Sequence, residues 1–160
     1  MAKPEPKKRK LKYADFDAMM SDVVSLMENG YTSHGNWNLS QSAHHVGEWM
    51  RFPMDGFPKP PLLIGMIMWV MKHTVAPRMK RKIFDEGFKG GIPTAPETVN
   101  QPDAISDAEA VEHLQKVADR LAAFEGDLIP SPFFGKMDLE MATKIALLHA
   151  EHHFGYLEPK

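Results

Sequence analysis

The segment Leu147-Leu148-His149-Ala150-Glu151-His152-His153-Phe154 places three histidines within five residues near the C-terminal end of the chain. Apolar residues precede this segment at helical spacing, so we expect it to belong to the last helix. Residues four positions apart lie on one face of a helix, offset by about 40°. His149 and His153 can therefore point into the same space, and this spacing is typical of metal ligands.

The apolar residues of this last helix, predicted over residues 139–156, form a face centred on His149. His152 and His153 fall on opposite flanks of that face, so angle alone does not choose between them. The pattern differs from the His-Glu-x-x-His motif of zinc peptidases because Ala150 follows His149. The alternative is that His149 is a hydrogen-bonded core histidine and the other two lie at the surface.

A second histidine pair, His44-His45, lies in an earlier helical pattern over residues 39–52, which we expect Pro53 to end. At about 100° per residue, His45 lies beside Trp49 at the edge of the apolar face, whereas His44 points toward solvent. Two helices that both direct histidines inward can supply three nitrogens to one metal ion. His45 is therefore the better candidate of this pair.

The composition narrows the class of protein. With 160 residues, 43% of them hydrophobic and 25% charged, the chain is expected to form one globular domain. Its formal net charge of −2 gives no overall attraction to nucleic acid or to an anionic membrane. The absence of cysteine excludes disulfides, thiolate metal sites and thiol nucleophiles, so histidine and carboxylate side chains must hold any metal.

The N-terminal segment differs in composition from the rest of the chain. Residues 1–12 contain six basic residues and two prolines, and we expect a disordered basic tail followed by a single domain over residues 13–160. The cluster Lys7 to Lys10 leaves nucleic-acid binding as a weaker alternative. The start of the chain lacks the apolar run of an export signal, and the longest apolar run, residues 62–71, is about half the roughly 20 residues that span a bilayer. We therefore expect a cytoplasmic protein without a membrane partner.

The spacing of apolar residues predicts an all-α fold. The expected helices cover residues 13–28, 39–52, 62–75, 107–125 and 139–156. The helix over residues 62–75 is apolar nearly all round, so it should be central in the fold or covered by a second subunit, which suggests a homodimer. Residues 78–82 form a basic cluster, interpreted as a solvated face or an anion-binding patch. Residues 87–105 form a long loop that could wall a site.

Three groups of residues resemble the DinB-like superfamily of four-helix-bundle metalloproteins, and most closely its uncharacterised branch. The first is Asn36-Trp37-Asn38-Leu39-Ser40-Gln41 leading to His45-Val46, and the second is Met54-Asp55-Gly56-Phe57-Pro58. The third is Pro132-Phe133-Phe134-Gly135 leading to His149, His152-His153 and Leu157. The resemblance covers most of the chain from the first predicted helix onward.

This resemblance implies an up-down-down-up four-helix bundle with an extra short helix and long loops. It also implies an open divalent-metal site for Zn, Ni or Fe, with His45, His149 and His153 as ligands. His44 and His152 remain the alternatives that could replace a predicted ligand. The chain departs from the pattern at Ser131, where a histidine often precedes the Pro-x-Phe-Gly turn in that branch.

Relatives in that superfamily with assigned activities resemble metal-dependent thiol S-transferases or metal-dependent hydrolases. By this resemblance we expect a transferase that uses a low-molecular-weight thiol and a small-molecule substrate, with a hydrolase as the alternative. The residues themselves identify no catalytic side chain. A non-catalytic bundle that binds metal structurally, or that dimerises through residues 62–75, is the hypothesis from a different class.

Overall fold

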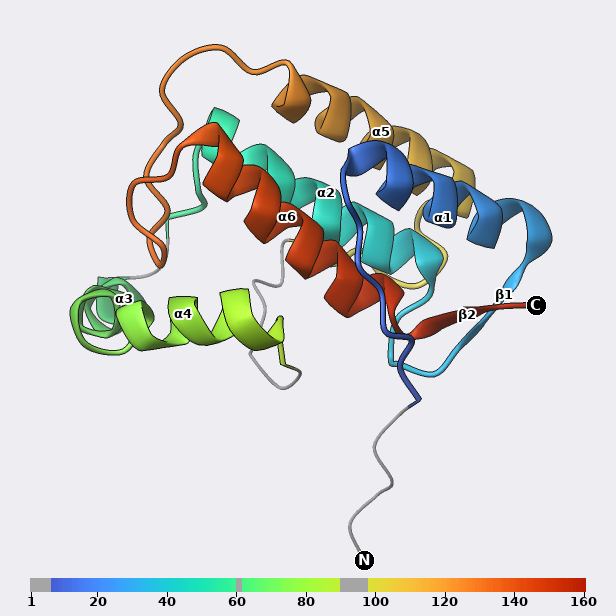
Figure 1. Ribbon diagram of the computed structural model, residues 1–160, viewed down its shortest axis with the longest axis horizontal. Coiled ribbons are helices and arrows are strands. Elements are labelled where there is room, and N and C mark those ends of the chain that lie inside the picture. Colours follow the sequence, from blue (N-terminus) through green and yellow to red (C-terminus); the bar gives the residue numbers. More distant parts are fainter. Residues whose placement is uncertain (1–6, 60–61, 90–97) are drawn as a thin grey trace, which may run out of the picture.

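The computed structural model describes residues 7–59, 62–89 and 98–160 and is mostly helical (Figure 1). The all-α class predicted from the sequence is confirmed. The helices are α1 (Phe16–Asn29), α2 (Leu39–Asp55), α3 (Leu62–Thr74), α4 (Ala76–Glu86), α5 (Asp107–Ala122) and α6 (Leu139–Phe154). Two short strands, β1 (Tyr31–Ser33) and β2 (Leu157–Pro159), complete the secondary structure. None of the described helices is both long and apolar enough to cross a lipid bilayer.

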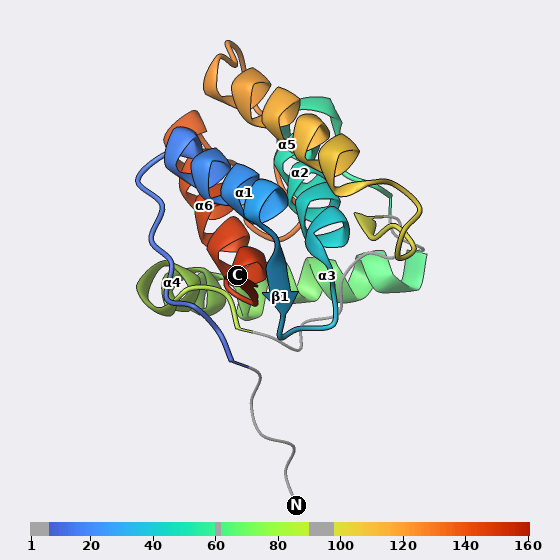
Figure 2. The same cartoon turned by 90° about the vertical axis from the view of Figure 1, so that its right-hand side faces the viewer.

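The helices α1, α2, α5 and α6 lie side by side and enclose the main hydrophobic core (Figures 1 and 2). The core comes from the apolar stripes that the sequence predicted on these helices, and Leu26, Leu39, Leu114 and Phe154 are among its fully buried side chains. The finer prediction of an up-down-down-up bundle of the DinB type stays a prediction.

Side-chain caps set the starts of the long helices. Asn38 accepts a hydrogen bond from the backbone N–H of Gln41, whose side chain accepts one from the backbone N–H of Asn38. Ser106 and Glu109 form the same reciprocal pair at the start of α5. Each pair satisfies backbone donors that the first helical turn leaves without partners. Both pairs follow a pattern that is readable from the sequence, a polar cap residue followed three positions later by Gln or Glu.

The side of α2 that carries His44 and Gly47 faces α5, whereas His44 was predicted to point toward solvent. Ser40 on this side is buried, and a Cβ added to Gly47 would lie 3.0 Å from the His113 side chain. His44 stands on this side, with its ring centroid 5.5 Å from that of His113. Small side chains allow two helices to approach closely, so a face that lacks large apolar residues can still form a helix interface.

Pro53 lies inside α2 and does not end it as predicted. The helix continues to Asp55, and Gly56 closes it by donating its N–H to the carbonyl of Phe52. A proline in the last turn removes one hydrogen bond, and its ring disturbs the preceding turn. Burial of Phe52, Pro53 and Met54 holds the turn in helical form, and the Pro53 carbonyl accepts a hydrogen bond from the backbone of Ile129.

The helix α3 is not central in the fold, which corrects one of the two explanations for its apolar sequence. It forms a layer with α4 outside the four long helices (Figures 1 and 2). Trp69 and Ile67 are exposed, with 66% and 53% of their surface open to solvent. No helix was predicted where α4 lies, since the basic cluster at 78–82 was interpreted only as a solvated face or an anion-binding patch. Pro77 occupies the first turn of α4, where it is tolerated.

Both terminal segments are fastened to the end of α6. The Arg9 guanidinium binds both oxygens of the Asp22 carboxylate at 2.9 Å and also donates to the Phe154 carbonyl at 3.1 Å. Tyr13 donates its hydroxyl hydrogen to Asp22 and its backbone N–H to Glu151. The predicted tail covered residues 1–12: residues 1–6 lie outside the described residues, and residues 7–12 have defined contacts that the prediction did not include.

The strand β2 follows α6 directly and pairs with β1 in an antiparallel register that places Ser33 opposite Leu157. Leu157 is fully buried in the core. The sequence analysis predicted no strand, because a pair of three-residue strands shows no readable alternation. Together with the segment around Arg9, this pairing restrains the C-terminal end of α6, which carries the three histidines.

Candidate metal centre

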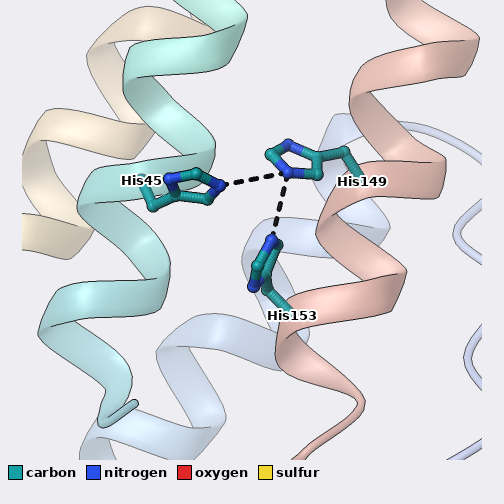
Figure 3. A group of neighbouring side chains, drawn as sticks. All are labelled: His45, His149 and His153. Atoms are coloured by element: carbon teal, nitrogen blue, oxygen red, sulfur yellow. Dashed lines mark hydrogen bonds between the residues drawn. The ribbon is translucent and has the colours of Figure 1, made fainter. Parts of the chain in front are cut away.

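Three histidine side chains from two helices converge at one point (Figure 3). His45 extends from α2, and His149 and His153 extend from successive turns of α6. The Nε2 atom of His149 lies 3.2 Å from Nε2 of His45 and 3.1 Å from Nε2 of His153. One ligand atom from each residue lies within 4.8 Å of the others. The structure thus brings together the three residues predicted as ligands, and they can hold a metal ion.

The distances fit a cation better than a hydrogen-bond chain. A single imidazole nitrogen carries either one proton or one lone pair, so Nε2 of His149 cannot serve both neighbours equally well. Two nitrogens bound at about 2.0–2.1 Å to a tetrahedral Zn²⁺ would lie about 3.3 Å apart. The two measured separations are 0.1–0.2 Å below that value. The third pair, His45 and His153, lies within 4.8 Å, so binding of one ion also requires these two rings to adjust.

Thr98 fixes the orientation of the His45 ring. Its hydroxyl oxygen lies 2.8 Å from Nδ1 of His45, and both residues are buried. A proton on Nδ1 that is shared with Thr98 leaves the lone pair of Nε2 directed at His149 and His153. Histidines that bind metals usually have such a partner on the second ring nitrogen, and this partner sets the tautomer.

The surroundings keep the three rings neutral. Burial lowers the pKa of His45 to about 4, although a hydrogen bond to the Thr98 backbone opposes this effect. Burial also holds the pKa values of His149 and His153 well below the usual range, and the neighbouring imidazoles lower them further. Neutral imidazole is the form that binds metals, so the centre needs no deprotonation at neutral pH. His149 and His153 are only partly buried, which leaves one side open.

The metal-free protein is expected to lose stability on acidification. The pKa of His45 is about 4 in the folded chain and about 6.5 unfolded, so the unfolded state binds more protons once the pH falls below about 6.5. This one residue should cost about 2 kcal/mol between about pH 7 and about pH 5, and the loss ends below the folded pKa. Urea denaturation of chelator-treated protein over this range measures the effect. A His45→Gln variant should show a shallower slope, and equal slopes would contradict the assignment.

Removal of the Thr98 hydroxyl should weaken metal binding. Substitutions of groups that orient a metal-binding histidine typically cost 10–100-fold in affinity. We expect about tenfold for Thr98→Val, because a hydrogen bond to the Thr98 backbone also supports the ring. Thr98→Ser, which keeps the hydroxyl, is the matched control and should bind as the wild type does. Competition with a chromophoric chelator measures both, and equal loss in the two variants would show that packing, not the hydrogen bond, matters.

Aromatic side chains surround the histidines. Trp37 stacks on His153 with ring centroids 5.0 Å apart, and Phe88 lies 5.3 Å from His149. Trp49 contacts the His149 ring edgewise at 6.3 Å. The described residues of the histidine group include no carboxylate. A divalent ion held there would keep its full positive charge inside an apolar wall, which favours an anionic ligand at a remaining coordination position.

The two alternative histidines lie outside the group. His152 points to the other flank of α6, where its Nδ1 atom lies 2.8 Å from the Phe88 carbonyl and 3.2 Å from Nζ of Lys8. His44 faces His113 across the interface of α2 with α5. Among the histidines of the described chain, the geometry therefore selects the three that the resemblance implied. Their role as metal ligands stays a prediction.

Sequence reasoning missed the neighbours of the histidines. Thr98 lies 53 positions from His45, and no periodic pattern links them. Trp37 was part of the motif that carried the family resemblance but received no role. The predicted loop over residues 87–105 does supply Phe88 and Thr98 to the centre, while residues 90–97 lie outside the described part of the chain. A loop of unusual length beside predicted ligands was the available signal.

Residues 5–160 match the model of DUF1569, a family described as a protein of unknown function. Searches of the curated proteins and of the solved structures found no significant match. The match covers nearly the whole chain, from the segment that fastens α6 to the last strand. The chain therefore belongs to the DUF1569 family.

Proposed function

We propose that this protein binds a divalent metal ion, Zn, Ni or Fe, through His45, His149 and His153 and acts as a metal-dependent thiol S-transferase. The observation that carries the proposal is the convergence of three imidazole nitrogens within 4.8 Å of one another, two pairs of them at 3.1–3.2 Å. Three protein ligands leave at least one position for an exchangeable molecule, as in catalytic metal centres. The resemblance to the DinB-like superfamily supports the same assignment.

A divalent ion in this centre would lower the pKa of a bound thiol, so that a nucleophilic thiolate is available at neutral pH. The protein side chains orient the ligand nitrogens and exclude water from the centre. His45, held by Thr98, orients one ligand nitrogen, and the rings of Trp37 and Phe88 exclude water on two sides. An apolar wall beside the nucleophile suits a small electrophile with an apolar body.

Hydrolysis is the alternative reaction and has less support. Metal-assisted hydrolysis generally uses a side-chain base near the activated water, often a carboxylate. The described carboxylate closest in sequence, Glu151, accepts the backbone N–H of Tyr13 and is not a member of the histidine group. Thiol transfer needs no such base if the metal supplies the thiolate, and the resemblance to the DinB-like superfamily is the ground on which we favour the transferase.

A non-catalytic role is the second class of function. A structural metal site normally has four protein ligands, whereas the described group has three. His149 and His153 also remain partly open to solvent. Both features favour an exchangeable position over a closed structural site.

The test begins with protein purified without a histidine tag. We expect near-stoichiometric uptake of Zn, Ni or Fe, followed by metal-dependent conjugation of a small thiol to an apolar alkylating reagent. His45→Ala should abolish both. Metal binding without thiol conjugation, and with ester or amide hydrolysis, would replace the transferase by the hydrolase. Absence of metal uptake would reject both and leave a bundle without a metal function.

A further inference from the structure

The helix α3 presents an apolar face to solvent. Five of its large apolar side chains are between 51% and 84% exposed, namely Leu62, Met66, Ile67, Trp69 and Val70. At about 100° per residue they cover one continuous arc of roughly 160°. The opposite arc carries Gly65, Met71 and Lys72, which are partly buried. An exposed apolar arc of this size marks an interaction surface.

The next helix supplies positive charge beside this face. Arg78, Lys80, Arg81 and Lys82 all lie in the first two turns of α4, next to the end of α3. Arg78, Arg81 and Lys82 are exposed. The acidic residues of α4, Asp85 and Glu86, lie in its last turn, and Glu86 pairs with Lys89. Although the net charge of the chain is −2, the first two turns of α4 form a local basic surface next to the end of α3.

We propose that α3 and the start of α4 form a peripheral binding surface for an anionic lipid bilayer. In this arrangement α3 lies along the interface with Trp69 and its apolar neighbours among the acyl chains. The cations of α4 contact the lipid headgroups. Exposed apolar residues with an adjacent basic cluster are the features of helices that bind membrane surfaces without crossing them. The net charge and the length of the apolar run predicted no membrane partner, because neither shows an apolar helix face exposed beside a local basic cluster.

A bilayer fits this surface better than the other occupants. In a symmetric dimer the same patch lies on both subunits, so pairing through α3 would cover the apolar side chains but offer no anionic partner to the basic residues of α4. Nucleic acid would match the cations but leave the exposed apolar side chains in water. Anionic lipid satisfies both parts of the surface at once.

Vesicle sedimentation with the full chain tests the proposal. We expect binding to mixed phosphatidylserine and phosphatidylcholine vesicles that falls as salt rises, and little binding to phosphatidylcholine alone. Each arginine near an anionic surface contributes about fivefold, so Arg78→Gln with Arg81→Gln should weaken binding roughly 25-fold. Trp69→Ser should weaken it about tenfold.

The matched control removes two exposed lysines elsewhere, Lys12→Gln with Lys116→Gln, and should leave vesicle binding unchanged. Circular dichroism verifies that each variant is folded. Equal loss in the control pair would mean that binding is only general electrostatic attraction and would overturn the proposal. So would failure of the wild type to sediment with anionic vesicles, a dimer in solution that Trp69→Ser dissociates, or binding of duplex nucleic acid that Trp69→Ser leaves intact. The metal centre is not involved in any of these readouts.

Discussion

His149→Ala is expected to weaken metal binding by a hundredfold or more. His149 occupies the middle of the three, since its Nε2 atom is the one within 3.2 Å of both other ligand nitrogens. Zinc sites with four protein ligands bind with roughly 10–16 kcal/mol, or about 3 kcal/mol for each ligand. A loss of about 3 kcal/mol is more than a hundredfold in affinity. Competition titration against a chromophoric chelator at neutral pH measures the change.

The matched control for this variant is His73→Ala, which removes an exposed histidine from α3. It should bind metal as the wild type does. His153→Ala should resemble His149→Ala, because both nitrogens belong to the same group. Similar small losses in all three variants would indicate adventitious binding by surface histidines and would contradict the centre.

Phe154→Ala is expected to destabilise the fold by about 3–5 kcal/mol. Phe154 is the largest fully buried side chain of the described residues, and it directly follows His153, a proposed metal ligand. Truncation of a buried phenylalanine loses the transfer free energy of the ring and leaves a cavity that packed neighbours fill only in part. Denaturation with guanidinium chloride, monitored by circular dichroism, measures the change in the free energy of unfolding.

A partly buried phenylalanine provides the comparison. Phe133→Ala removes the same side chain from the loop before α6, where solvent already reaches part of the ring. Its loss should be about 1 kcal/mol, well below that of Phe154→Ala. The metal affinity of folded Phe154→Ala should fall less than that of His149→Ala. Equal destabilisation by the two phenylalanine variants would contradict the greater contribution of the buried Phe154 ring to the stability of the fold.

The sequence predicted the parts of the fold that follow from local rules. Apolar periodicity and capping boxes identified four long helices, with the starts of α2 and α5 at Asn38 and Ser106. Local rules failed where tertiary contacts decided the outcome. Pro53 stays helical because its neighbours are buried, and α2 approaches α5 closely at Gly47.

The same division holds for the candidate metal centre. Helical spacing placed His149 on the inner face of α6 and His45 near that of α2, and the family resemblance selected His153 over His152. Spacing could not identify Thr98 or Phe88, because their contacts with His45 and His149 depend on the path of a long connection. Helical spacing also could not show that α3 lies outside the core, since an apolar helix has the same sequence pattern whether it is enclosed or exposed to solvent.

The chain separation of the histidines has a kinetic consequence. His45 and His149 are 104 positions apart, so an ion bound to both acts as a removable cross-link between distant parts of the chain. Closing so long a loop costs conformational entropy before the contact forms. Contacts of this kind therefore often form after the rate-limiting step of folding. Interactions absent from the transition state slow unfolding without speeding folding. Bound metal should therefore lengthen the lifetime of the native state under proteolysis while leaving the refolding rate nearly unchanged.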